Sequence, residues 1–207
     1  MIRVLGRTSS MNVRKVLWTL DELGLAHERE DWGAGFASTR DPAFLALNPN
    51  GLVPVLIDAA GPLWESNTIC RYLAGRQGDA SLLPLEPRAR AGVEQWMDWQ
   101  VTELNSAWRY AFQALSRRAP GYDDPGLTQD SVAAWNAAMS LLDARLALTA
   151  AFVAGETFTL ADICLGLATH RWLRTPMARP TLPAVETYYA RLRTRPAFAS
   201  HALDAVA

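Results

Sequence analysis

Cysteine and lysine are scarce in this chain of 207 residues, which contains two cysteines and a single lysine, Lys15. Cys70 and Cys164 lie far apart, and no Cys-x-x-Cys pair occurs. We therefore expect neither a disulfide framework nor a redox-active dithiol, and we expect the protein to reside in a reducing compartment. We expect both cysteines to act as small buried hydrophobic residues.

The sequence also lacks a strong charge of either sign and a long apolar run. Its formal net charge is −1 at pH 7, which argues against nucleic acid as a partner. No stretch approaches the length of a membrane span, and the first residues become polar too soon for a signal peptide. The cytoplasm is the expected location. His27, His170 and His201 show no metal-ligand spacing, so no metal is expected.

Residues 48–57 predict a turn that leads into a short strand. Asn-Pro and Asn-Gly pairs mark the turn, and residues 53–57 are apolar and partly β-branched. Pro54 cannot donate a ladder hydrogen bond, so it belongs at the start of a strand or on an edge, and its peptide bond can be cis. A peptide-like ligand could then pair with the backbone of Val53 as one more strand.

Glu65 and Ser66 are predicted to open the next helix, whose residues Ile69, Tyr72 and Leu73 keep helical spacing. A helix N-terminus offers free N–H groups and a partial positive charge, which suit a carboxylate. Ser66 adds a hydroxyl, and Glu65 can accept from an ammonium group. A ligand that carries an amine and a carboxylate on one carbon fits this pair, and a capped helix start without a ligand is the alternative.

The Val53-Pro54 pair before a strand, with Glu65-Ser66 at the next helix start, resembles the glutathione site of the cytosolic glutathione transferases. In that family the Val-Pro pair, with a cis proline, binds the cysteinyl backbone, and the Glu-Ser pair holds the γ-glutamyl end. The resemblance implies these roles for Val53, Pro54, Glu65 and Ser66. It also implies glutathione as cosubstrate, a homodimer and a function in detoxification.

The predicted elements up to about residue 77 follow the order β-α-β-α-β-β-α. The first strand–helix–strand unit implies a parallel pair with a right-handed crossover, and the turn at residues 58–62 implies a hairpin. This thioredoxin-like order agrees with the resemblance. We therefore predict a thioredoxin-like glutathione-binding domain at residues 1–78, a linker at 79–88 and an all-helical substrate-binding domain at 89–207.

The predicted helices of the second domain cover residues 89–118, 128–150, 163–172, 183–194 and 196–201. Thr159 and Asp162 have the spacing of a capping box at the start of the third of these helices. That helix is apolar nearly all round, which predicts the centre of a helical bundle. The resemblance implies that the capping box serves folding and not catalysis.

Glutathione chemistry needs a thiolate, and the loop between the first strand and the first helix carries the residues that could stabilise it. One hydroxyl bond to an anion is worth ~1.5–3 kcal/mol, and a thiol pKa lowered by ~2 units needs about 2.7 kcal/mol. Serine-type transferases resemble Ser-x-x-x-Arg before an apolar helix, and Ser10 with Arg14 matches that pattern. Ser9 matches if the loop is shifted by one residue, and Asn12 matches classes that read Thr-x-Asn or Ser-x-Asn.

The loop contains neither tyrosine nor cysteine. The tyrosine-type classes are therefore excluded, and thiol–disulfide chemistry is disfavoured. The alternative for Ser9, Ser10 and Asn12 is that they only cap the first helix, with Asn12 as the N-cap residue.

Four residues of the second domain, Trp108, Arg109, Tyr110 and Phe112, are candidates for the electrophile pocket, and core packing is their alternative role. The main prediction is a serine-type transferase, similar to theta, phi or beta bacterial members, whose glutathione thiolate attacks a small hydrophobic electrophile. A glutathione-dependent isomerase or dehalogenase, or a non-catalytic glutathione-binding or partner-binding protein, would share the same fold.

Overall fold

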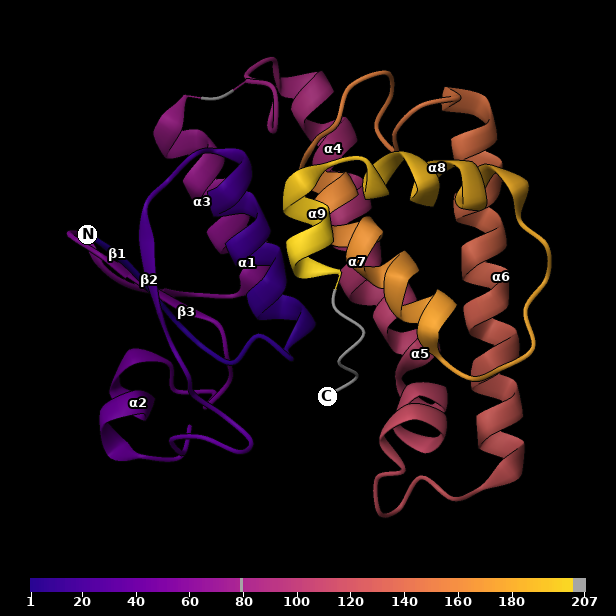
Figure 1. Ribbon diagram of the computed structural model, residues 1–207, viewed down its shortest axis with the longest axis horizontal. Coiled ribbons are helices and arrows are strands. Elements are labelled where there is room, and N and C mark those ends of the chain that lie inside the picture. The colour runs from indigo at the N-terminus through magenta and orange to yellow at the C-terminus, as the bar shows by residue number, and fades with distance from the viewer. Residues whose placement is uncertain (79, 203–207) are drawn as a thin grey trace. The chain divides into compact units, whose positions relative to one another are not determined.

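The computed structural model describes residues 1–78 and 80–202 (Figure 1). The chain forms two compact units, Met1–Leu83 and Pro84–Ala207. Among the described residues, no helix combines the length and the hydrophobicity that a membrane crossing needs.

The first unit is built on a four-stranded sheet with the order β2-β1-β3-β4. Its strands are β1 (Ile2–Leu5), β2 (His27–Glu30), β3 (Val55–Asp58) and β4 (Gly61–Trp64). Strand β1 runs parallel to β2 and antiparallel to β3, and β3 and β4 form the predicted hairpin. The two central strands, β1 and β3, are apolar because both faces of the sheet are covered.

Helices α1 (Met11–Glu22) and α3 (Ser66–Gln77) pack against each other on one face of the sheet (Figure 1). The short helix α2 (Pro42–Leu47) lies on the other side, where Phe44 packs with Leu5 and Val55. The element order β1-α1-β2-α2-β3-β4-α3 confirms the predicted thioredoxin-like arrangement.

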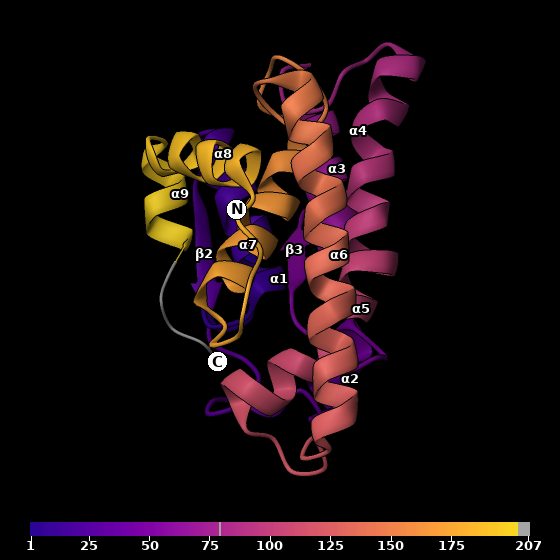
Figure 2. The same cartoon turned by 90° about the vertical axis from the view of Figure 1, so that its right-hand side faces the viewer.

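The second unit is helical throughout its regular elements. It contains α4 (Pro87–Trp99), α5 (Asn105–Phe112), α6 (Pro125–Thr149), α7 (Leu160–Arg174), α8 (Pro183–Arg193) and α9 (Pro196–His201). Helix α7 packs against α4 and α8, and α6 packs against α5 and α8 (Figures 1 and 2). Every residue from Leu160 to His170 is buried, which agrees with the central place predicted for this helix.

The capping box predicted at the start of α7 is confirmed. The Thr159 N–H donates to the Asp162 carboxylate over 2.8 Å, and the Thr159 hydroxyl donates to the same oxygen over 3.2 Å. The Val153 N–H donates to the second carboxylate oxygen over 2.9 Å. Asp162 therefore fixes both the helix start and the loop that precedes it.

Three helix boundaries differ from the sequence prediction. The helix predicted at residues 89–118 begins at Pro87 and runs through two π-helical turns, Gln100–Leu104 and Gln113–Arg117. Helix α6 begins at Pro125 instead of residue 128. In both cases a carboxylate one residue before a proline caps the helix, Glu86 in α4 and Asp124 in α6. Helix α7 begins at Leu160, directly after its capping threonine.

The predicted N-cap of the first helix was wrong. Ser10 holds this position, with the extended backbone angles φ −79° and ψ 121°, and Asn12 lies in the first helical turn. Met11 is buried, so the helix starts with an apolar residue that packs inward, two residues earlier than expected.

Candidate functional site

Three loops meet at one end of the sheet in the first unit. Leu5 pairs with Val55, and Val55 pairs with Trp64. The chain therefore leaves β1, enters β3 and leaves β4 at the same end of the sheet. A Cβ atom on Gly6 would lie 3.0 Å from the Cβ of Val53. The loop after β1 therefore closely approaches the Val53–Pro54 bond.

Ser10 stands at the start of α1 with its hydroxyl uncommitted to the helix. Its N–H donates to the Arg7 carbonyl over 3.1 Å, and its carbonyl accepts from the Arg14 N–H over 3.0 Å. Within the described residues the Ser10 side chain forms no capping bond. Ser9 is half-buried beside it, whereas Asn12 is exposed. Of the three predicted residues, Ser10 thus has the position and the available donor for a ligand at the helix start.

Two cations lie within the first turns of α1. Arg14 is only 5% exposed, and burial lowers the pKa of its guanidinium to about 10, so it remains charged near neutral pH. Lys15 is fully buried, and its Nζ donates to Asn67 Oδ1 of α3 over 3.1 Å. The Arg14 charge adds to the partial positive charge at the N-terminus of α1, which favours an anion there.

The Val53–Pro54 peptide bond is cis, as predicted from the resemblance. Asn48 shapes the approach to it, because its Nδ2 donates to the Leu52 carbonyl over 2.7 Å. Val53 precedes Val55, the first residue of β3 that pairs in the sheet. Its main-chain groups therefore lie outside the strand ladders.

Glu65 and Ser66 turn the chain directly from β4 into α3. Glu65 has φ 71° and ψ 109°, a backbone region that side-chain-bearing residues seldom adopt and that often marks functional sites. Ser66 begins the helix and is 6% exposed. Glu65 is the N-cap residue of α3, and its side chain makes no capping hydrogen bond in the described part of the chain. It therefore leaves the first N–H groups of α3 available to a ligand.

The four candidates for the electrophile pocket do not form one cluster. The rings of Trp108 and Phe112 lie 5.4 Å apart, and the guanidinium of Arg171 lies over both, 4.4 Å and 4.3 Å from the ring centres. Tyr110 instead packs on Tyr122, 5.1 Å away, and its hydroxyl accepts from the Asp124 N–H. It therefore supports the loop before α6.

Arg109, the fourth of these candidates, is exposed. The structure thus brings together Trp108 and Phe112 and adds Arg171, which the sequence reasoning did not single out.

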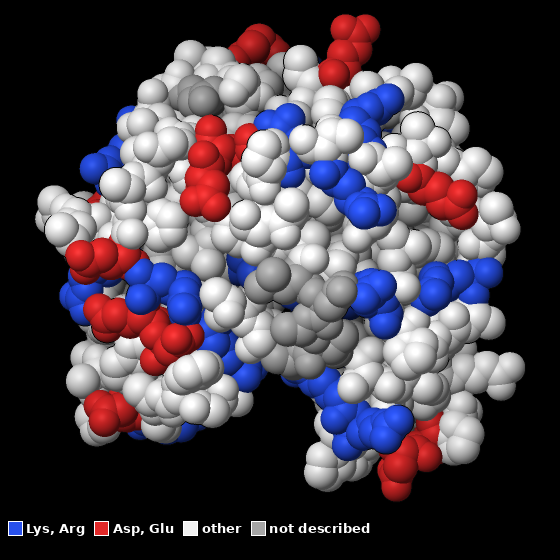
Figure 3. All heavy atoms as spheres, in the orientation of Figure 1, with Lys and Arg blue, Asp and Glu red and all other residues white. Residues whose placement is uncertain are grey.

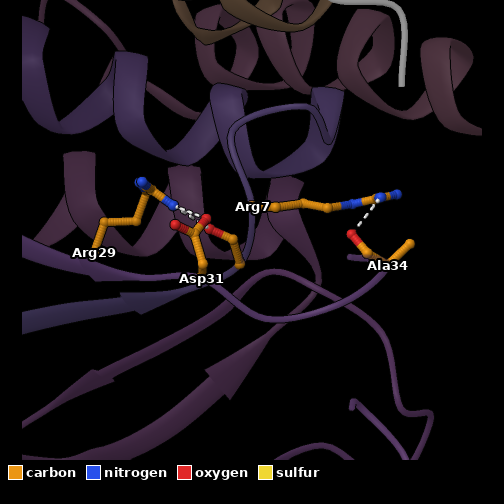
Figure 4. A network of polar contacts seen from close by, with 5 residues as sticks. Arg7, Arg29, Asp31 and Ala34 are labelled. Atoms are coloured by element: carbon orange, nitrogen blue, oxygen red, sulfur yellow. Dashed lines mark hydrogen bonds and ion pairs between the residues drawn. The ribbon is translucent and has the colours of Figure 1, made fainter. Parts of the chain in front are cut away.

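Arg7 is a second residue that the sequence reasoning missed. It lies in the loop after β1, and its Nη1 donates to the Ala34 carbonyl over 3.2 Å (Figure 4). Arg29 pairs with Asp31 nearby and also donates to the Gly6 carbonyl over 3.2 Å. The available signal was a lone arginine two residues before the candidate serines.

The cysteines and His170 are buried in the interior of the protein. Cys70 and Cys164 are buried, as expected, and form no disulfide with each other, and Cys70 accepts a hydrogen bond from the Thr19 hydroxyl. His170 is buried, with Nδ1 2.8 Å from the Tyr189 hydroxyl. The described part of the chain holds no group of three or more His, Cys, Asp or Glu side chains arranged for a metal.

These features define a protein with a thioredoxin-like unit, a cis proline beside an open helix start, and a helical second unit. Residues 9–76 match the N-terminal domain of glutathione S-transferases. The chain is 39% identical to glutathione S-transferase GstB of Escherichia coli (strain K12) over 95% of both chains. It is also 32% identical to a probable elongation factor 1-gamma 2 of Arabidopsis thaliana, covering 83% of this chain and 41% of that protein.

Among solved structures, the chain is similar to the theta class glutathione S-transferase from Xanthomonas axonopodis pv. citri with glutathione bound. The identity is 38% and the TM-score 0.92, over 100% of this chain and 99% of that one. The chain therefore belongs to the glutathione S-transferase family.

Proposed function

We propose that this protein is a serine-type glutathione transferase in which Ser10 stabilises the thiolate of bound glutathione. The thiolate attacks an electrophilic carbon of a small hydrophobic molecule. Family membership supports the transferase activity, and one observation carries the role of Ser10. Three features lie at the same end of the sheet: the Ser10 hydroxyl, which does not cap the helix, the cis Val53–Pro54 bond and the start of α3.

Glutathione binding follows from the groups that these three loops leave open. The cysteinyl backbone pairs with the main chain of Val53, which lies outside the strand ladders. The γ-glutamyl carboxylate binds the Ser66 hydroxyl and the first N–H groups of α3. Glu65, exposed at the same turn, accepts from the γ-glutamyl ammonium group.

The chemistry requires stabilisation of the thiolate. A free thiol has a pKa of about 8.5, so only a minor fraction is ionised near neutral pH. A hydrogen bond from Ser10 to the sulfur is worth ~1.5–3 kcal/mol, and the N-terminus of α1 adds a favourable charge. The sulfur then forms a bond to carbon, and the leaving group departs with the electron pair of the broken bond.

Ser9 and Asn12 are the alternative donors to the sulfur. Ser9 is half-buried in the same loop, and Asn12 is exposed on the first turn of α1. Either residue takes the role of Ser10 if the bound tripeptide lies further along the loop. Neither residue holds the N-cap position of α1, which Ser10 occupies.

The helical unit contributes the site for the electrophile in this proposal. Trp108, which is half-buried, provides apolar surface for it, and the buried Phe112 packs against the Trp108 ring, with Arg109 and Tyr110 as lesser candidates. We assign residues 1–78 to glutathione binding, residues 79–88 to a linker and residues 89–207 to the electrophile. We also propose a cytoplasmic homodimer that acts in detoxification without a metal.

The decisive test is a titration of glutathione into the protein, followed by thiolate ultraviolet absorbance as a function of pH. The native chain should lower the thiol pKa by ~2 units, and Ser10→Ala should return it towards about 8.5. Ser9→Ala and Asn12→Ala are the matched controls and should keep the lowered value. If a control loses it and Ser10→Ala does not, the role moves to that residue. Absence of glutathione binding would refute the proposed function.

A further inference from the structure

Arg7 belongs to the same turn as the proposed thiolate donor. The Ser10 N–H donates to the Arg7 carbonyl, and such a turn keeps its first and fourth Cα atoms within about 7 Å. The Arg7 side chain therefore leaves the backbone close to the position proposed for the sulfur. Its guanidinium points across to the loop after β2, where Ala34 accepts its Nη1 (Figure 4).

Arg7 carries a charge that no carboxylate of the described chain neutralises. A guanidinium has five N–H donors, and Ala34 takes one of them. The Nε atom is buried and has no hydrogen-bond partner among the described residues. Two other arginines of this region differ, because Arg3 pairs with Glu30 and Arg29 pairs with Asp31.

The Arg7 side chain is also held in place before any ligand arrives. A Cβ atom on Gly33 would lie 3.8 Å from both Cδ and Nε of Arg7, so the stem of the arginine rests on the loop after β2. The bond to Ala34 fixes the planar end group. A fixed guanidinium loses little conformational freedom on binding and suits the planar geometry of a carboxylate.

The carboxylates of glutathione have other partners in the proposed site. The γ-glutamyl carboxylate lies at the start of α3, with Ser66. A second cation, Arg40, packs against the turn before Val53, where a Cβ atom on Gly51 would lie 2.9 Å from its Nη1. This leaves Arg40 beside the turn that precedes Val53 and Arg7 on the turn that carries Ser10.

We propose that Arg7 binds a carboxylate on the electrophile and makes this enzyme selective for small electrophiles that carry an anionic group. This inference rests on the proposed function, because it assumes a thiolate at Ser10. In the reaction with a carboxylated aryl halide, the sulfur–carbon bond forms and the carbon–halogen bond breaks. The halide leaves with the bonding electrons, and the carboxylate stays on Arg7 unchanged.

The test compares two electrophiles that differ only in charge, 4-chloro-3,5-dinitrobenzoate and 4-chloro-3,5-dinitrobenzamide. Each rate is divided by the uncatalysed rate with glutathione, which removes the difference in intrinsic reactivity. The native chain should prefer the benzoate by at least about 10-fold in kcat/KM. In Arg7→Gln the benzoate should lose about 10- to 100-fold, mainly through a higher KM, and the benzamide should change by less than about 2-fold.

Arg3→Gln is the matched control, since it removes an arginine from β1 whose side chain is paired with Glu30. It should leave the preference for the benzoate intact. Arg7→Lys keeps the charge without the planar fork and should restore part of the preference. Inhibition of the native chain by 3,5-dinitrobenzoate, compared with 3,5-dinitrobenzamide, gives a second readout that needs no variant to fold.

The outcomes separate the two proposals. Turnover of both electrophiles with a lowered thiol pKa but no preference for the benzoate overturns the role of Arg7 and leaves the transferase function standing. An equal loss for both electrophiles in Arg7→Gln, with a raised thiol pKa or a raised KM for glutathione, assigns Arg7 to glutathione and overturns the inference. No glutathione binding and no turnover in the native chain would overturn both.

Discussion

Helix α7 and helix α1 begin differently, although a hydroxyl residue stands at the N-cap of each. At α7 the Asp162 carboxylate accepts from the main chain of Thr159 and Val153. At α1 the Ser10 side chain makes no bond to the helix that it opens. We call the start of α7 closed, because a carboxylate of the chain accepts hydrogen bonds there. The start of α1 is open, because the Ser10 hydroxyl and the first N–H groups remain available to a ligand.

The same contrast extends to the other helices. Carboxylates also accept from the first turns of α2, α4, α6 and α8, through Asp41, Glu86, Asp124 and Asp143. Among the described helices of eight or more residues that start after a loop, α1 and α3 lack such a carboxylate bond. Both belong to the unit with the candidate glutathione site. A helix start whose N–H groups an anionic ligand is to occupy cannot have those groups bonded to a carboxylate of its own, and Glu65 at the N-cap of α3 makes no such bond to the described residues.

Removing the carboxylate at α7 should have the largest effect. Asp162→Ala leaves the buried N–H groups of Val153 and Thr159 without acceptors, so the free energy of unfolding should fall by about 3 to 5 kcal/mol. Urea unfolding measures the change. The exposed Glu156→Ala is the control and should cost little. A loss below ~1 kcal/mol would mean that the closed start contributes little to folding.

The buried Asp162 should also make stability depend on pH. Burial raises its pKa to about 6, against the opposing bonds from Val153 and Thr159. The unfolded chain has the ordinary value near 3.8, so the native state holds its proton longer as pH rises. Relative to Asp162→Asn, which does not titrate, the native chain should lose about 3 kcal/mol between pH 4 and pH 7. Urea unfolding at each pH gives the difference, and a constant difference would contradict the raised pKa.

Closing α1 as the other starts are closed should abolish activity without harming the fold. In Ser10→Asp the new carboxylate can cap the helix and add up to ~1 kcal/mol of stability. It should repel the thiolate, so kcat/KM should fall by at least about 100-fold, and the thiol pKa should rise above about 8.5. Turnover with a generic aryl halide and thermal unfolding test the two parts. An active variant would show that the start of α1 is not the thiolate site.

Opening α3 further should weaken the binding of glutathione. Ser66→Ala removes one hydroxyl from the proposed γ-glutamyl site, so the Kd for glutathione should rise by about 10-fold with little change in kcat. Calorimetric titration measures the affinity. Thr68→Ala alters the exposed neighbour in the same turn and serves as the control. Equal effects of the two variants would argue against a ligand at Ser66.

Removing the cap of α6 should have the smallest effect. Asp124 Oδ1 accepts from the Leu127 N–H over 3.0 Å at an exposed site, and loss of such a cap costs about 1 kcal/mol. The measurement is thermal unfolding of Asp124→Ala against Asp123→Ala. Glutathione affinity should stay the same in both, since α6 belongs to the helical unit.

Much of the fold was predictable because local patterns determine it. The hairpin with its turn at residues 58–62 and the Thr159–Asp162 capping box each follow from a few adjacent residues. The start of α1 was misplaced because Ser10 and Asn12 have similar capping propensities. The burial of Met11, a tertiary effect, decides between them.

The candidate site was predictable only where its residues are adjacent in the chain. The pairs Val53-Pro54 and Glu65-Ser66 can be recognised from their residue types and their spacing in the sequence. Arg7 and Arg171 become visible only through contacts with Ala34, Trp108 and Phe112. The separation of Tyr110 from Trp108 likewise depends on the direction in which each side chain leaves α5, and the π-helical turn before α5 changes that direction relative to α4.

The burial of three side chains has a consequence for how the folded protein would react with electrophiles. Cys70, Cys164 and Lys15 are the only thiols and the only ε-amine in the sequence, and all three are buried. The folded surface therefore presents no cysteine thiol and no lysine amine to an electrophile. The protein's own thiols are therefore shielded from the electrophile, and in the proposed reaction the accessible thiol is that of bound glutathione.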